Sequence, residues 1–135
     1  MRIVLDTNSL IQSVSPRSLY HDVWLSILNG SNVLCVSNEI LEEYAEILHR
    51  LAGSYTAELV LNAIMECSSV EFFTPHYHFN LINADPDDNK FVDCAIQANA
   101  HYIVTNDSHY DVLHHIDFPK VCVIKLADFL LMIRK

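Results

Sequence analysis

The sequence is poor in glycine and proline and has no long apolar run. Only 2 of its 135 residues are Gly and 4 are Pro, which excludes collagen-like and low-complexity chains. No apolar stretch approaches the roughly 18 residues of a membrane-spanning helix. The opening apolar run already ends at Asp6, too early for the apolar region of a signal peptide. We therefore expect one soluble, cytoplasmic domain over residues 1–135, without a membrane partner.

Basic residues are also scarce, since 8 Lys and Arg stand against 17 Asp and Glu and leave a formal charge of −9. Proteins that attach to nucleic acid or acidic membranes by charge alone normally present a basic face. Disorder is excluded as well, because 51% of the residues are hydrophobic and only 19% are charged. The chain can thus bury a core, and the question is where its surplus acids gather.

The four cysteines form neither a metal-binding nor a disulfide pattern. They are far apart and contain no Cys-x-x-Cys pair: Cys35, Cys67, Cys94 and Cys122. Each lies in an apolar context, which predicts buried free thiols. Free thiols fit a reducing compartment.

Strand-like and helix-like apolar patterns alternate along the chain. The pattern predicts strands at 2–5, 33–36, 70–73, 102–105 and 121–124, and helices at about 16–28, 38–51, 55–66, 86–99, 108–114 and 127–133. Strands that are apolar on both sides and alternate with helices indicate a parallel sheet covered on both faces. We predict an α/β fold with three α/β/α layers and a central, mainly parallel sheet of about five strands. Such sheets bind ligands beyond the carboxyl ends of their strands.

Two acids follow predicted strands directly. Asp6 comes immediately after the first strand, and Asp107 follows the 102–105 strand after one intervening residue. For either residue alone, helix capping or turn formation is the favoured explanation. Two such acids in one chain suggest a site without specifying one.

Helical spacing selects one acid of the 38–51 helix. Successive residues of a helix are rotated by about 100°, which places Glu43 at the margin of the apolar stripe. From there it can reach a partly enclosed site. The other three acids of this helix point to solvent: Glu39, Glu42 and Glu46.

The helix opened by Asp85-Pro86-Asp87-Asp88 repeats this pattern more strongly. Asp88 projects onto the middle of its apolar stripe, whereas Lys90 and Asp93 fall on the opposite, exposed side. Capping explains Asp85 well and stays an alternative for Asp88. An acid at the head of a buried stripe favours a functional role.

Four acids thus approach the carboxyl end of the predicted sheet: Asp6, Glu43, Asp88 and Asp107. Two like charges about 4 Å apart repel by about 4 kcal/mol at an effective dielectric constant near 20. Such a group requires a protonated acid or a bound cation. Carboxylates without Cys or His favour Mg²⁺ or Mn²⁺ over zinc. A cation of this kind can activate water and stabilise a phosphoryl oxygen, which points to phosphodiester hydrolysis.

Five sequence blocks span nearly the whole chain: Ile3-Val-Leu-Asp-Thr-Asn8, Ser37 to Leu48, Asp85-Pro-Asp-Asp-Asn through Ala95, Tyr102-Ile-Val-Thr-Asn-Asp107 and Leu126-Ala-Asp-Phe-Leu130. In their order and spacing these blocks resemble the PIN domain family and, within it, the toxins of bacterial toxin–antitoxin pairs. The resemblance implies a compact α/β/α nuclease that uses Mg²⁺ or Mn²⁺ to cut RNA.

The resemblance also implies roles for individual residues. Asp6, Glu43, Asp88 and Asp107 match the family's catalytic, metal-binding acids, and the supporting polar positions are Asn8 and Thr105. Two basic residues near the expected cleft are candidates for contact with substrate phosphate: Arg17 and Lys90. The implied partners are an RNA substrate, a small antitoxin protein bound near the 19–28 or 55–66 helix, and a second copy of the chain.

Three other functions fit the same architecture less well. A haloacid-dehalogenase-type phosphatase needs Asp where this chain has Asn8. A receiver domain needs a phospho-accepting Asp after its third strand, where this chain has Phe73-Thr74-Pro75. A non-catalytic PIN-like binding module or scaffold is the main alternative. All four acids are present, which favours a catalytic protein over a scaffold, and the resemblance then implies an endoribonuclease acting on single-stranded or loop RNA.

Overall fold

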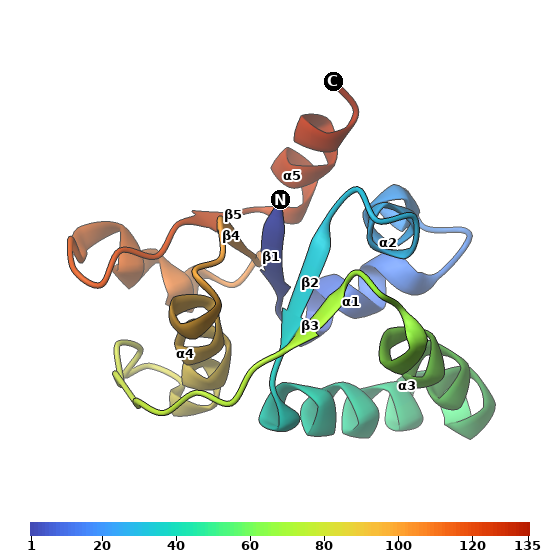
Figure 1. Cartoon of the computed structure of the whole chain (residues 1–135), viewed down its shortest axis with the longest axis horizontal. Helices are drawn as coiled ribbons and strands as arrows, with labels where there is room; N and C mark the ends of the chain where they lie inside the picture. The colour runs from blue at the N-terminus through green and yellow to red at the C-terminus, as the bar shows by residue number, and fades with distance from the viewer.

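Strands and helices alternate throughout the computed structural model, which describes residues 1–135 (Figure 1). Their order is β1 (Arg2–Leu5), α1 (Thr7–Val14), α2 (His21–Leu28), β2 (Val33–Val36), α3 (Asn38–Glu66), β3 (Val70–Phe72), the 3-10 helix η1 (Pro86–Asp88), α4 (Asn89–Ala98), β4 (Tyr102–Val104), the 3-10 helix η2 (Ser108–His115), β5 (Val123–Ile124) and α5 (Leu126–Ile133). None of these helices combines the length and apolarity needed to span a bilayer.

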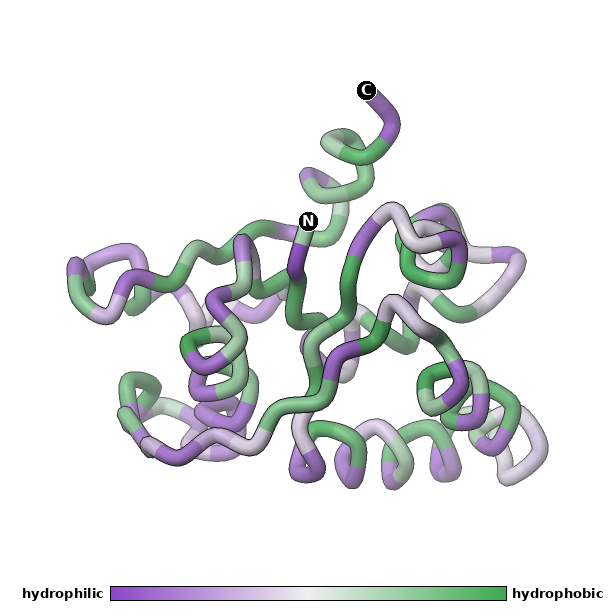
Figure 2. Tube along the Cα trace, viewed as in Figure 1, coloured by the Kyte–Doolittle hydropathy of each residue, from purple (hydrophilic) through white to green (hydrophobic).

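The five strands form one parallel sheet in the order β3-β2-β1-β4-β5. On one face, α4 packs against β1, β2 and β4, while α1 packs against β1 and lies with α2 on the other (Figure 1). The predicted three-layer α/β/α architecture is confirmed. Its physical basis is that both faces of the central strands are apolar, as their colour in Figure 2 shows.

The core holds the carboxyl end of the sheet in a fixed position. Ile3, Val4 and Leu5 of β1 are completely buried. The buried hydroxyl of Tyr44, on α3, donates a hydrogen bond of 2.6 Å to the carbonyl oxygen of Leu5. The first half of α3 is therefore fastened to the last residue of β1 and runs past the end of the sheet (Figure 1).

One helix was missing from the prediction. Helix α1 begins directly after β1 and contains more polar than apolar residues. Asp6 caps it by accepting a hydrogen bond from the Ser9 amide, and the Ser13 hydroxyl donates to the Ser9 carbonyl within it. Ser9 and Ser13 are both buried, and because their side chains are small and polar, helix α1 shows no apolar stripe in the sequence.

The predicted break between the 38–51 and 55–66 helices is confirmed. The element α3 spans both, but Gly53 within it has the non-helical angles φ 85° and ψ 165°. The chain changes direction there, so the second half of α3 leaves the carboxyl edge and returns toward β3 (Figure 1).

The prediction that Asp93 faces solvent is wrong. Asp93 is buried and accepts hydrogen bonds from the Phe79 amide at 3.2 Å and from the ring Nδ1 of His78 at 3.4 Å. The segment between β3 and η1 crosses this side of α4, a contact that helical periodicity does not reveal. Burial raises the pKa of the Asp93 carboxyl above its ordinary value.

The prediction of buried cysteines holds for only part of the set. All four are free, and Cys35 and Cys94 are buried while Cys67 is partly so. Cys122 is exposed because β5 begins one residue later, at Val123, and does not include it.

Candidate functional site

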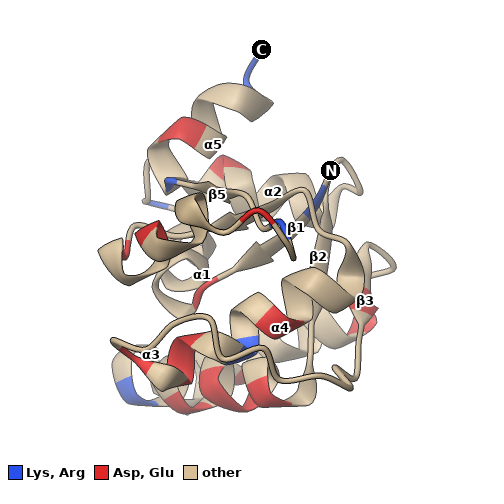
Figure 3. Ribbon diagram, turned by 90° about the vertical axis from the view of Figure 1, so that its left-hand side faces the viewer, with Lys and Arg blue, Asp and Glu red and all other residues tan.

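The four predicted acids line one cavity of about 300 Å³ at the carboxyl end of the sheet. Figure 3 shows acidic segments along α3, on α4 and between β1 and α1, with few basic segments near them. The complete lining is Asp6, Thr7, Asn8, Glu43, Ile47, Arg50, Leu51, Asp85, Asp87, Asp88, Phe91 and Asp107.

Asp6 is held by the protein's own hydrogen bonds. Its carboxylate accepts from the Ser9 amide at 2.8 Å and from the Thr105 hydroxyl. The Thr105 oxygen in turn accepts from the Asp107 amide at 3.0 Å, so one hydroxyl links two of the acids. Burial raises the pKa of Asp6, and the bonds from Thr105 and Ser9 oppose that rise.

Glu43 is also held on both carboxylate oxygens. One accepts from the Thr7 hydroxyl, and the other lies 2.6 Å from the Lys90 ammonium. Glu39, Glu42 and Glu46 are exposed, as predicted, so Glu43 is the only acid of its helix segment in the cavity. Lys90 already has an anionic partner within the protein.

Asp88 differs because its Oδ2 is buried and has no hydrogen-bond partner. Burial and then the charges of Asp85 and Asp107 raise the pKa of its carboxyl to about 6. The Tyr110 hydroxyl is likewise buried without a partner, and burial raises its pKa too. Asp88 and Tyr110 lie near enough to affect each other's pKa. The Asp88 Oδ2 is therefore available to a ligand without requiring one.

Asp107 brings a histidine into the site that the sequence did not predict. Asp107 caps η2 by accepting from the His109 amide at 2.9 Å. The His109 Nδ1 lies 3.5 Å from Asp107 Oδ1 and 3.7 Å from Asp88 Oδ2.

Asp85, Asp88 and His109 form a group of possible metal ligands, since one ligand atom of each lies within 4.8 Å of those of the others. Asp85 does cap η1, by accepting from the Asp87 amide at 3.1 Å, so capping and cavity lining coincide in one residue. No histidine was expected among the acids, and the position of His109 shows that this expectation is wrong. No spacing pattern in the sequence marks it, because its position depends on the course of η2.

The remaining predicted residues differ in whether they line the cavity. Asn8 is exposed and lines the cavity, and Thr105 is buried behind it. Arg17 is exposed between α1 and α2 and is not part of the lining. Arg50, which sequence reasoning did not single out, is part of it.

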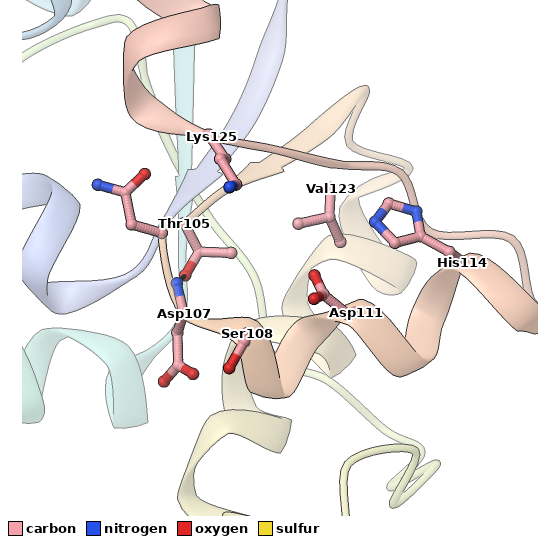
Figure 4. Close-up of a pocket in the computed structure, with 8 residues that line it drawn as sticks. Thr105, Asp107, Ser108, Asp111, His114, Val123 and Lys125 are labelled. Atoms are coloured by element: carbon pink, nitrogen blue, oxygen red, sulfur yellow. Dashed lines mark hydrogen bonds between the residues drawn. The ribbon is translucent and has the colours of Figure 1, made fainter.

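A second pocket, of about 100 Å³, lies on the other side of the segment after β4. In Figure 4, Lys125, Asp111 and His114 reach toward Val123, while the carboxylate of Asp107 points away from them. The Asn106 side chain accepts a hydrogen bond from the Leu126 amide at 3.0 Å. This bond fastens the segment that carries Asp107 to the start of α5.

The donor set of the larger cavity fits a hard divalent cation. Carboxylate oxygens are the ligands that Mg²⁺ and Mn²⁺ prefer, whereas an imidazole such as that of His109 is a ligand more typical of zinc and other transition metals. The buried, unpartnered Oδ2 of Asp88 offers a ligand atom that the protein itself leaves unsatisfied.

Residues 2–109 match the sequence profile of the PIN domain. The chain belongs to the PIN domain family. The family assignment agrees with the resemblance inferred from the motifs, and the match includes all four predicted acids that line the cavity. No curated protein sequence matches this PIN domain significantly.

Solved structures share the fold of this PIN domain. VapBC2 from Rickettsia felis, bound to a DNA fragment from its promoter, superposes with a TM-score of 0.62 at 18% identity, covering 93% of this chain and 98% of that one. VapBC-1 from nontypeable Haemophilus influenzae gives 0.64 at 15% identity, covering 94% and 99%. The PIN domain endonuclease Utp24 gives 0.54 at 15% identity, covering 92% and 84%.

Proposed function

We propose that this PIN domain is a Mg²⁺- or Mn²⁺-dependent endoribonuclease that hydrolyses phosphodiester bonds in single-stranded or loop RNA. The observation that carries the proposal is the meeting of Asp6, Glu43, Asp88 and Asp107 in one cavity beyond the carboxyl ends of the strands. Membership of the PIN family supports it, since Utp24 of the same fold is a PIN domain endonuclease.

Each acid has a proposed place in the site. Asp6, Asp88 and Asp107 hold the cation, Glu43 binds it or orients water, and Asp85 and His109 lie close enough to take part. When bound, the cation activates water and offsets the negative charge that grows on the phosphate oxygens.

The protein's own contribution is to fix the carboxylates before substrate arrives. Thr105 and the Ser9 amide orient Asp6, and Thr7 and Lys90 orient Glu43. Bonds of this kind set which lone pairs face the cavity. Asn8, exposed at its edge, is placed to contact substrate or a water molecule.

We further propose that the protein is the cytoplasmic toxin of a toxin–antitoxin pair. Two structures with its fold are VapBC assemblies. The formal charge of −9 favours a partner with a basic segment. Co-purification of a small protein encoded by the adjacent reading frame tests this assignment separately from the chemistry.

The nuclease assignment is tested by cleavage of labelled single-stranded RNA with Mn²⁺, with Mg²⁺ and with EDTA. Asp6→Asn should lower the rate by more than about 100-fold, beyond the loss typical of residues that only orient a ligand. Asp128→Asn, at an exposed acid of α5, is the matched control and should cleave normally. Unchanged Mn²⁺-dependent cleavage by Asp6→Asn contradicts the proposal, and a wild type that binds RNA or a protein partner but never cleaves favours the scaffold alternative.

A further inference from the structure

The cavity contains a single strongly basic residue. Its lining includes six carboxylates, Asp6, Glu43, Asp85, Asp87, Asp88 and Asp107, and only one Lys or Arg, namely Arg50. An RNA strand carries a negative charge on every phosphate, and a cation bound at the acids offsets the charge of the phosphate next to it. Phosphates on either side of the reacting one still need a positive partner.

Arg50 is free to serve as that partner. Three of the eight Lys and Arg residues are held in ion pairs with acids: Arg2 with Glu71, Lys90 with Glu43 and Arg134 with Asp22. Arg50 is exposed and forms no hydrogen bond or ion pair, although it shares a cavity with six acids. Its guanidinium therefore keeps all its donors available for a ligand.

The position of Arg50 places it beside the acids rather than among them. It follows Glu43 by seven residues on α3, which is two helical turns or about 10 Å along the same helix face. Ile47 and Leu51 line the cavity between and next to these two residues. Leu51 is 63% exposed, so it offers apolar surface to a molecule in the cleft.

We infer that Arg50 binds a backbone phosphate of the RNA next to the one that is cut, with Ile47 and Leu51 packing against the adjoining nucleotide. The inference rests on the proposed nuclease function and names the contacts that hold its substrate. A guanidinium suits this role because it can grip two phosphate oxygens at once. Arg50 acts as a positioning residue, and it takes the role for which the sequence had suggested Arg17.

The test compares Arg50→Ala, Arg50→Lys and the matched control Arg17→Ala, which removes the same charge from an exposed site outside the cavity. Steady-state cleavage of single-stranded RNA is measured in saturating Mn²⁺ over a range of salt concentrations. Arg50→Ala should lower kcat/KM by about 10- to 100-fold, mainly through KM, because a charge-assisted contact is lost. Its slope of log(kcat/KM) against log[salt] should become shallower by about 0.7, the contribution of one phosphate contact to a single strand.

The two other variants define the result further. Arg50→Lys keeps the charge and should retain the wild-type salt slope while recovering only part of the lost kcat/KM. Arg17→Ala should match the wild type in both quantities. An unchanged KM and salt slope in Arg50→Ala, or an equal effect of Arg17→Ala, overturns the inference.

A binding measurement separates this inference from the nuclease assignment. RNA affinity is measured by fluorescence anisotropy for Asp6→Asn and for Asp6→Asn combined with Arg50→Ala, with unchanged melting temperatures as the check on folding. The added Arg50→Ala change should weaken binding by about 10-fold or more. A wild type that does not cleave, together with this loss of affinity, rejects the nuclease and keeps the phosphate site; equal affinities in the two proteins reject the phosphate site whether or not the wild type cleaves.

Discussion

The two halves of the cleft are built in opposite ways. In the hydrogen-bonded half, Asp6 and Glu43 have partners on both carboxylate oxygens, supplied by Ser9, Thr105, Thr7 and Lys90. The other half is formed by Asp85, Asp88, Asp107 and His109, and we call it unpartnered because of Asp88, whose Oδ2 is buried with no hydrogen-bond partner and whose carboxyl has a pKa of about 6. Asp85 and Asp107 accept hydrogen bonds only from backbone amides. The first half is arranged by the fold itself, and the proposed cation would complete the second.

The difference follows from the elements that carry each half. Asp6 and Glu43 project from the end of β1 and from α3, which the Tyr44–Leu5 hydrogen bond joins. The unpartnered half comes from the two short 3-10 helices η1 and η2 and their caps. The charges of Asp85 and Asp107 repel that of Asp88, and the His109 Nδ1 stays 3.7 Å from Asp88 Oδ2, beyond hydrogen-bond distance.

The largest expected effect comes from removing the orphaned acid. Asp88→Asn should lower RNA cleavage by more than about 100-fold and abolish the rise in melting temperature that Mn²⁺ gives the wild type. In the metal-free state the variant should melt higher than the wild type, because a buried unpaired charge is gone. Thermal denaturation with and without Mn²⁺ measures both effects; Asp117→Asn, at an exposed acid, serves as the control. A wild-type Mn²⁺ response in Asp88→Asn is incompatible with the comparison.

In the hydrogen-bonded half the same kind of change should destabilise. Thr105→Val removes the donor to Asp6 and the acceptor of the Asp107 amide. We expect cleavage to fall by about 10- to 100-fold and the free energy of unfolding by about 1–3 kcal/mol. Chemical denaturation and cleavage assays measure the two effects, with the exposed Thr74→Val as the control. If Thr105→Val were as stable and active as the wild type, the hydroxyl would not be organising this half.

The unpartnered half should also make stability depend on pH. The pKa of Asp88 rises from 3.8 to about 6 on folding, so the folded state binds this proton more tightly than the unfolded state. The resulting stabilisation is complete below about pH 4 and is lost as the pH rises through about 6. It amounts to at most about 3 kcal/mol.

Urea denaturation of the metal-free wild type and of Asp88→Asn, followed from about pH 4 to about pH 7, isolates this contribution. The wild type should lose stability relative to the variant over that range. Parallel curves would show that Asp88 titrates in the folded protein as it does in the unfolded chain.

The smallest effect is expected where the protein supplies its own cation. Lys90→Met should lower the free energy of unfolding by about 1 kcal/mol, because Glu43 loses a partly buried ion-pair partner but keeps Thr7. The exposed Lys120→Met provides the control in the same denaturation experiment. A Lys90→Met protein that is more stable than the wild type would mean that the pair costs more in desolvation than it returns.

The acids of the cleft could be predicted because each occupies a position that the fold class defines. Asp6 and Asp107 follow strands, and parallel strands bring their carboxyl ends to one edge. Glu43 and Asp88 lie on or beside the apolar stripes of helices. Local pattern and global topology therefore gave the same answer for all four.

What the sequence did not reveal depends on contacts between distant segments. The exposure of Asp93 is decided by the segment between β3 and η1, which donates the Phe79 amide to it. His109 enters the site through the course of η2. Helix α1 was not predicted because its buried face includes small hydroxyl side chains in place of apolar residues.

The backbone angles of Gly53 let the first half of α3 line the cavity while the second half packs against β3. Continued without interruption, the 29 residues of α3 would make a rod of about 43 Å, whose far end could not return to the sheet. A Cβ at this position would meet nothing within 4 Å, so space does not restrict the residue, but the positive φ does. The conformation of Gly53 thus sets how far α3 extends past Arg50 along the cleft. A residue with a side chain at this position would either be strained or straighten α3, and in a straight helix the second half would no longer reach β3.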